Sequence, residues 1–228
     1  MTTLRTPWQR RILALQATHP SIQRLADATE AYAAGMLAGD YRKRLVIIGG
    51  PGNGKTHVLE CLWLWHRGIP VSRWPKGNRD GNYDGFSCEF VDWPGLCRRA
   101  QKDGEDGQWL DAQNCGLLLL DDIGSEVDGF KSGEPTTLLR ALLGARQQRW
   151  TVVTTNIPVS NWRRSWDERV ADRLCRDSRI VDLGHCPSFA FTGKPEAKRG
   201  SSESKPATEE QYREFAKRFA ELRTTICT

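Results

Sequence analysis

Short apolar runs of strand length alternate with longer stretches of helical spacing in the middle of the chain. The runs are rich in Val, Ile, Leu and Thr and occupy residues 44–48, 89–93, 116–124, 150–156 and 179–183. Continuous apolar runs of this kind are typical of buried parallel strands, and the stretches between them have helical periodicity. The pattern therefore predicts an α/β domain with a parallel sheet.

The flanking residues predict helical additions to this domain. Residues 1–43 have the spacing of two short helices, the second beginning at Ser21 and ending at Gly39. After a core at 44–184, residues 185–207 are polar and charged, which indicates a linker. Residues 208–228 begin with a capping box and carry an apolar stripe, which predicts a C-terminal helix.

A glycine-rich segment directly after the first apolar run matches the phosphate-binding pattern G-x-x-x-x-G-K-[ST]. Glycines let successive backbone N–H groups converge on phosphate oxygens, and the start of the following helix adds its dipole. Lys55 supplies a charge for the β- and γ-phosphates of ATP, and the Thr56 hydroxyl is placed to bind Mg²⁺. The candidate nucleotide-binding residues are Gly49, Gly50, Pro51, Gly52, Asn53, Gly54, Lys55, Thr56 and His57.

Polar side chains close two of the later apolar runs. Asp121 and Asp122 end the third run, and Asn156 ends the fourth. Because ligands bind at the carboxyl ends of parallel strands, we expect Asp121 to hold Mg²⁺ opposite Thr56. Asp122 is expected to orient or deprotonate the attacking water, and Asn156 to hydrogen-bond the γ-phosphate or that water. Strands that end in ordinary polar turns are the alternative.

Residues 72–87 are rich in Gly, Asn and Asp and predict a long insertion loop within the core. The loop contains Arg73, Lys76 and Arg79 together with Trp74. Basic and aromatic side chains in one loop make it a candidate contact for single-stranded nucleic acid. A surface insertion without such a role is the alternative.

Net charge and cysteine content limit the class of protein to which the chain can belong. The balance of 33 basic and 28 acidic residues gives a net charge of +5, which permits nucleic-acid contact without requiring it. The seven cysteines are scattered without C-x-x-C spacing, which favours reduced thiols over a disulfide framework or a zinc site. Apolar runs of membrane-spanning length and a signal peptide are both lacking. We therefore expect a soluble, cytoplasmic protein with no membrane contact.

Four motifs, taken in order, resemble those of AAA+ ATPases of the DnaC/IstB type. They are Gly-Gly-Pro-Gly-Asn-Gly-Lys-Thr-His at 49–57, Leu-Leu-Leu-Leu-Asp-Asp-Ile-Gly at 117–124, Thr-Val-Val-Thr-Thr-Asn-Ile-Pro at 151–158 and Asp-Arg-Leu at 172–174. The resemblance implies a three-layer αβα core with a central parallel sheet. The functional positions of the family fall on Lys55 and Thr56 (Walker A), Asp121 and Asp122 (Walker B), Asn156 (sensor 1) and Arg173 (arginine finger).

An arginine finger acts on the nucleotide of a neighbouring subunit. The resemblance therefore implies self-association on ATP binding, with Arg173 completing the site of the next copy. Arg169 and Arg176 are competing candidates in the same segment.

The resemblance further implies an ATPase that acts in DNA replication as a helicase loader, binding single-stranded DNA and a replicative helicase. A transposase helper that selects target sites is the close alternative, and the core motifs do not separate the two. A small-molecule P-loop kinase and a nucleotide-dependent binding module with little turnover are alternatives from other classes. The short N-terminal segment, the long loop and the C-terminal extension depart from the family pattern and are consistent with a phage or mobile-element origin.

Overall fold

The computed structural model describes residues 21–39, 43–67, 84–103, 107–126 and 133–184. By its internal contacts the chain divides into two compact units, Met1–Gly193 and Lys194–Thr228, and the described residues all belong to the first. The predicted helix before residue 21, the basic residues of the insertion loop, the linker and the C-terminal helix lie outside the described residues.

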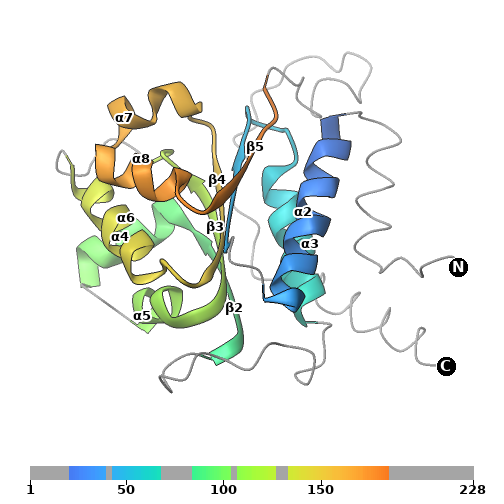
Figure 1. Ribbon diagram of the computed structural model, residues 1–228. Helices are drawn as coiled ribbons and strands as arrows, with labels where there is room; N and C mark the ends of the chain where they lie inside the picture. Colours follow the sequence, from blue (N-terminus) through green and yellow to red (C-terminus); the bar gives the residue numbers. More distant parts are fainter. Residues whose placement is uncertain (1–20, 40–42, 68–83, 104–106, 127–132, 185–228) are drawn as a thin grey trace, which may run out of the picture. The chain divides into compact units, whose positions relative to one another are not determined.

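The described residues form a five-stranded parallel sheet (Figure 1). The strand order is β2-β3-β4-β1-β5. The strands are β1 (Arg44–Ile48), β2 (Asp84–Asp92), β3 (Cys115–Ile123), β4 (Trp150–Thr155) and β5 (Ser178–Asp182). This confirms the α/β class and the parallel sheet, and it brings the ends of β1, β3 and β4 together at one edge.

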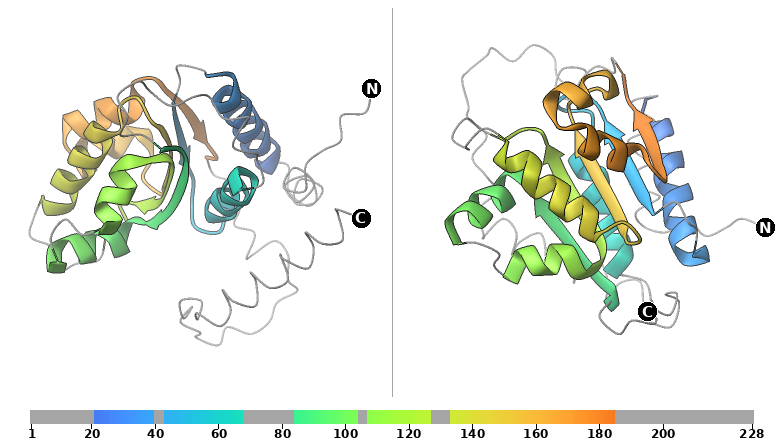
Figure 2. Two further views of the ribbon diagram at one scale, coloured as in Figure 1. Left: turned by 90° about the horizontal axis from the view of Figure 1, so that it is seen from below. Right: turned by 60° about the vertical axis from the view of Figure 1, so that its left-hand side comes forward.

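Helices cover both faces of the sheet, so the three-layer arrangement is confirmed (Figures 1 and 2). One face carries α2 (Ser21–Ala38) and α3 (Lys55–Arg67). The other face carries α4 (Trp93–Asp103), α5 (Gly107–Asn114), α6 (Glu134–Ala145), α7 (Trp162–Ser165) and α8 (Glu168–Cys175). Right-handed crossovers explain this division, because the step from β1 to β2 runs across the sheet in the opposite direction to all later steps.

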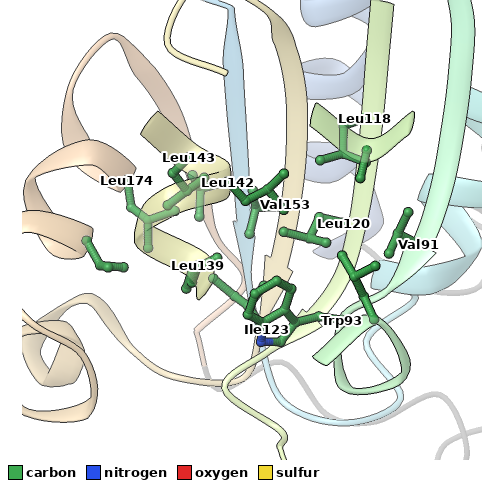
Figure 3. Packing of buried hydrophobic residues seen from close by; sticks show 14 of the residues in the cluster. Val91, Trp93, Leu118, Leu120, Ile123, Leu139, Leu142, Leu143, Val153 and Leu174 are labelled. Atoms are coloured by element: carbon green, nitrogen blue, oxygen red, sulfur yellow. The ribbon is translucent and has the colours of Figure 1, made fainter. Parts of the chain in front are cut away.

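Alternating residues of the central strands feed two separate cores. In β3, Leu117 and Leu119 pack with α2 and α3, whereas Leu118 and Leu120 pack on the opposite face. Figure 3 shows this second core, in which Leu139 of α6 approaches Ile123 and Trp93. Because both faces are covered, β3 is apolar at successive positions, as the sequence pattern indicated.

A buried arginine joins the starts of β3 and β4, at the edge of the sheet opposite the one where these strands end. Arg146 is 0% exposed, and its Nη1 donates to the carbonyls of Ala112 at 2.8 Å and Cys115 at 3.0 Å. Its Nη2 donates to the Trp150 carbonyl at 2.6 Å, and its Nε to Thr151 Oγ1 at 3.0 Å. Backbone carbonyls at these strand starts are therefore satisfied by one guanidinium, as buried acceptors require.

Two local predictions need correction. Residues 84–87, expected in the loop, belong to β2, because Asp84 pairs with Cys115 of β3 after a register shift. Trp93, expected to end that strand, begins α4. Helix α5 was not predicted from the sequence. The segment before β5 contains a 3₁₀ turn, η2 (Val159–Asn161), and two short helices.

Other predicted elements are confirmed, namely the helix from Ser21 to Gly39, the helix from Lys55 to Arg67 and the strands at 44–48, 116–124, 150–156 and 179–183 to within one or two residues at each end. Within the described ranges, no helix is long and apolar enough to cross a membrane.

Candidate nucleotide-binding site

The phosphate loop joins β1 to α3, and its glycines meet specific backbone demands. Gly52 and Gly54 have φ of 77° and 79°, in the left-handed region that glycine adopts without a steric penalty. A Cβ on Gly49 would lie 3.1 Å from Leu183 Cβ, so the loop packs closely against the residue that follows β5. The Gly49 N–H also donates to the Thr155 carbonyl at 3.1 Å, which fixes the loop to the end of β4.

The rest of the loop divides into exposed and buried positions. Pro51 and Gly52 are exposed, Gly50 is half-buried, and Asn53 is 4% exposed, with its amide nitrogen close to Gly49. The Gly54 carbonyl accepts the first hydrogen bond of α3, from the N–H of Val58 at 3.1 Å. The loop thus ends in a helix N-terminus, where backbone N–H groups and the helix dipole favour an anion.

Lys55 is buried and uses all three protons of its ammonium group. Its Nζ donates to the carbonyls of Gly49 at 2.8 Å and Gly50 at 3.0 Å, and to Asn156 Oδ1 at 2.7 Å. Burial lowers the pKa of Lys55, and the charges of Asp122 and Asp121 oppose this effect. The predicted Walker A lysine and the predicted sensor 1 residue are therefore in direct contact.

The two predicted magnesium ligands also meet. Thr56 Oγ1 donates to Asp121 Oδ2 at 2.8 Å, and Asp121 is 8% exposed at the end of β3. Hydroxyl and carboxylate oxygens are the ligands that Mg²⁺ prefers, and one or two protein ligands beside phosphate oxygens are usual for this ion. No group of three His, Cys, Asp or Glu residues suited to a metal occurs among the described residues. The pair fits an ion shared with a bound nucleotide.

Asp122 lies beside this pair in an uncommon backbone conformation. Its φ is 61°, and its backbone N–H donates to Thr154 Oγ1 at 2.8 Å. Burial raises the pKa of the Asp122 carboxyl, the charge of Asp121 raises it further, and Lys55 opposes the rise. A half-buried carboxyl with a raised pKa, one residue from a predicted magnesium ligand, is suited to accept a proton from water.

The contacts described for His57 are with residues of its own helix, α3. Its Nε2 lies 3.6 Å from Cys61 Sγ, and its Nδ1 lies 3.7 Å from Glu60 Oε2. The contact with Cys61 raises the pKa of His57 most, and the contact with Glu60 raises it further. His57 stands directly after Thr56 at the start of α3. Its predicted role in binding a nucleotide stays a prediction.

Arg173 does not join the other site residues within one chain. It lies on α8, and its Nη1 donates to the Arg140 carbonyl of α6. Of its competitors, Arg176 donates to Asp172 at 2.8 Å, and Arg169 is exposed. A finger that serves a neighbouring subunit would have to leave the Arg140 carbonyl, so this assignment stays a prediction.

Two side chains at the site were missed in the sequence. Thr154 bonds Asp121 and Asp122, and Glu126 accepts from the Gly124 N–H at 3.1 Å and from the indole of Trp93. The signal for Thr154 was a hydroxyl residue two positions before Asn156, but the run also contains Thr151 and Thr155, and threonines are common in ordinary strands.

Sequence comparisons with known proteins give no family, because no protein-family model and no curated protein matches the chain. Solved structures do match. The DnaC helicase loader is 20% identical with a TM-score of 0.53, over 72% of this chain and 90% of that one. A DNA replication initiation factor is 13% identical with a TM-score of 0.51, over 72% of this chain and 46% of that one.

A third similar structure is the replication initiator DnaA bound to AMPPCP and single-stranded DNA. It is 12% identical with a TM-score of 0.52, over 74% of this chain and 48% of that one. The chain thus spans less than half of the two initiation proteins and most of the helicase loader. With its strand order and phosphate loop, the chain has the AAA+ P-loop fold.

Proposed function

We propose that this protein is an ATP-binding and ATP-hydrolysing AAA+ factor that acts in DNA replication as a helicase loader. The observation that carries the ATPase part of the proposal is a set of side-chain contacts at the edge where β1, β3 and β4 end. Lys55 bonds Asn156, and Thr56 bonds Asp121. A nucleotide that binds there contacts both Walker motifs and β4 at once.

Each residue has a defined task in this proposal. The loop N–H groups bind the phosphates, and Lys55 redirects its N–H hydrogen bonds from the Gly49 and Gly50 carbonyls to phosphate oxygens. Thr56 and Asp121 would hold Mg²⁺, which would neutralise charge on the phosphates. Asp122 orients the attacking water and accepts its proton, and Asn156 fixes the γ-phosphate or that water.

Hydrolysis is tested by phosphate release together with ATP binding. We expect the wild type to turn over, Lys55→Ala to lose binding and turnover, and Asp122→Asn to keep binding and lose turnover. A binding module with little turnover predicts that the wild type and Asp122→Asn behave alike. Transfer of phosphate to a nucleoside or metabolite instead of water would support the kinase alternative.

The DNA part of the proposal is supported by structural likeness. The helicase loader DnaC matches over 90% of its length, and the DnaA structure that matches contains AMPPCP and single-stranded DNA. If about four to six phosphates are contacted, log K should fall with log salt by about 0.7 per contact. The absence of DNA binding at low salt, with and without ATP, would contradict this part.

The partner distinguishes the loader from its close alternative. We expect a pull-down from the host with Mg²⁺ and a non-hydrolysable ATP analogue to retain a replicative helicase. Lys55→Ala is the matched control, because it should not retain the partner under the same conditions. Retention of a transposase instead would assign the chain to target-site selection, and retention of neither would contradict both assignments.

A further inference from the structure

The Thr154 hydroxyl lies between the two candidate Walker B carboxylates. Thr154 is 0% exposed, and its Oγ1 donates to Asp121 Oδ1 at 2.5 Å. The same oxygen accepts the backbone N–H of Asp122 at 2.8 Å. A hydroxyl has a single proton to donate, so the bond to Asp121 and the bond from Asp122 fix its orientation.

These bonds hold Asp121 on both carboxylate oxygens. Oδ1 accepts from Thr154 of β4, and Oδ2 accepts from Thr56 of α3. With Oδ1 committed to Thr154, the plane of the carboxylate is fixed and Oδ2 is turned toward Thr56, the other candidate ligand. Hydrogen-bond partners of a ligating carboxylate orient it in this way, and their loss typically costs about 10- to 100-fold in metal affinity or activity.

The same hydroxyl holds the backbone of Asp122. A φ of 61° is uncommon for a residue with a side chain, and Asp is among the few types that adopt it at moderate cost. The hydrogen bond from the Asp122 N–H to Thr154 compensates that cost and determines where the carboxyl can lie. Loss of the hydroxyl would leave a buried N–H and a carboxylate oxygen without their partner.

We propose that Thr154 is a positioning residue that sets the orientation of Asp121 and the backbone of Asp122 through one hydroxyl group. This inference rests on the proposed ATPase function. It adds a side-chain link between β4 and the site, because Thr154 bonds the candidate Walker B acids while Asn156, the residue after β4, bonds Lys55. A shift of β4 by the nucleotide would move both acids together.

The first test needs no nucleotide. We compare amide hydrogen exchange at Asp122 in the wild type, Thr154→Val and Thr154→Ser. Valine keeps the shape without the hydroxyl, and serine keeps the hydroxyl. We expect exchange at Asp122 to be about tenfold faster or more in Thr154→Val and close to wild type in Thr154→Ser. Equal protection in all three proteins would overturn the inference.

The second test is turnover with a magnesium titration. We expect kcat to fall about 10- to 100-fold in Thr154→Val, the Mg²⁺ concentration for half-maximal rate to rise about tenfold, and KM for ATP to change little. Thr154→Ser should restore both values to within about threefold. Thr151→Val is the matched control, since it removes a buried hydroxyl from the same strand at the Arg146 end and should leave both values unchanged.

The results of these tests distinguish a failure of the role of Thr154 from a failure of the proposed ATPase function. A wild type that hydrolyses ATP together with an unaffected Thr154→Val, or a Thr154→Ser as damaged as the valine variant, would overturn the role of Thr154 alone. A wild type without turnover would overturn the proposed function and the inference that rests on it. If Thr154→Val does not fold, Thr154→Ala replaces it in the same comparison with Thr154→Ser.

Discussion

Lys55 Nζ lies 2.7 Å from Asn156 Oδ1, so the phosphate loop and the end of β4 are joined by a direct hydrogen bond. The bond places an amide at the ammonium group that is expected to contact the γ-phosphate. Lys55 donates its other two protons to carbonyls of its own loop. A nucleotide whose phosphate oxygens accept the Lys55 hydrogen bonds in place of these carbonyls changes the contact with Asn156 at the end of β4, which gives a physical route from nucleotide state to the segment that follows.

Asn156→Ala tests this link. The change removes an acceptor that competes with phosphate for Lys55 but also removes the contact to the reacting group. We expect ATP affinity to change by less than about threefold and kcat to fall by about 10²-fold. Ser160→Ala, an exposed change in η2, serves as the control and should alter neither value. A kcat equal to that of the wild type in Asn156→Ala would contradict a role of Asn156 in hydrolysis.

Asp122 predicts a specific pH dependence. Burial and the charge of Asp121 raise the pKa of its carboxyl above the usual 3.8. The carboxyl accepts a proton only when ionised, so kcat/KM should fall as the pH drops through the raised pKa of the free protein, at a higher pH than for an ordinary aspartate. An acidic limb of kcat/KM in the normal Asp range would contradict this assignment.

The same shift affects stability without nucleotide. Because the folded pKa is raised, ionisation of Asp122 costs folding free energy above that pKa, and protonation relieves the cost at low pH. Asp122→Asn should therefore melt at a higher temperature than wild type at pH 7, since Asn also tolerates the φ of 61°. The difference should disappear below about pH 3.9, where the aspartate is protonated in both states.

Arg146→Lys tests the buried guanidinium at the opposite edge of the sheet. A lysine has a single ammonium group and cannot reach carbonyls on α5, β3 and β4 together. We expect the free energy of unfolding to fall by about 2–4 kcal/mol, because buried carbonyls lose their partner. Arg149→Lys is the matched control, since the half-buried Arg149 side chain donates to the Gln113 carbonyl and to Asn114 at the end of α5, and the change should cost less than about 1 kcal/mol. Equal free energies of unfolding of the two variants, measured by urea denaturation, would contradict this role of Arg146.

Arg173 is tested by mixing variants. If it acts on the nucleotide of a neighbouring copy, Arg173→Ala should lower turnover by about 10³-fold or more. Adding Lys55→Ala, which is inactive itself but supplies an intact Arg173, should restore part of that activity. Arg169→Ala and Arg176→Ala are controls and should retain turnover. No recovery in the mixture would favour a structural role on the Arg140 carbonyl.

The sequence predicted those parts of the fold that depend on local pattern. The phosphate loop was found because its glycines occupy left-handed positions that few other residues adopt, as at Gly52 and Gly54. The run ending at Asp121 and Asp122 was recognised as a strand because both of its faces are buried.

Features that depend on tertiary pairing were missed. The first residues of β2 contain Gly and Asp and pair with β3 only after a register shift, so their composition indicated a loop. Helix α5 is eight residues long and is fixed by the burial of Trp109 and Ala112, which its sequence alone does not show. Thr154 and Arg146 look like ordinary strand and helix-end residues until their partners from distant segments are known.

The melting temperature with and without Mg·ATP tests the central claim, nucleotide binding at the loop from Gly49 to Thr56, most directly. A hundredfold excess over the dissociation constant stabilises the folded state by about 2.7 kcal/mol, which corresponds to roughly 5–10 °C for a domain of this size. We expect this shift in the wild type and in Lys102→Ala, an exposed control, and its loss in Lys55→Ala. A wild type that melts at the same temperature with and without Mg·ATP would contradict the account.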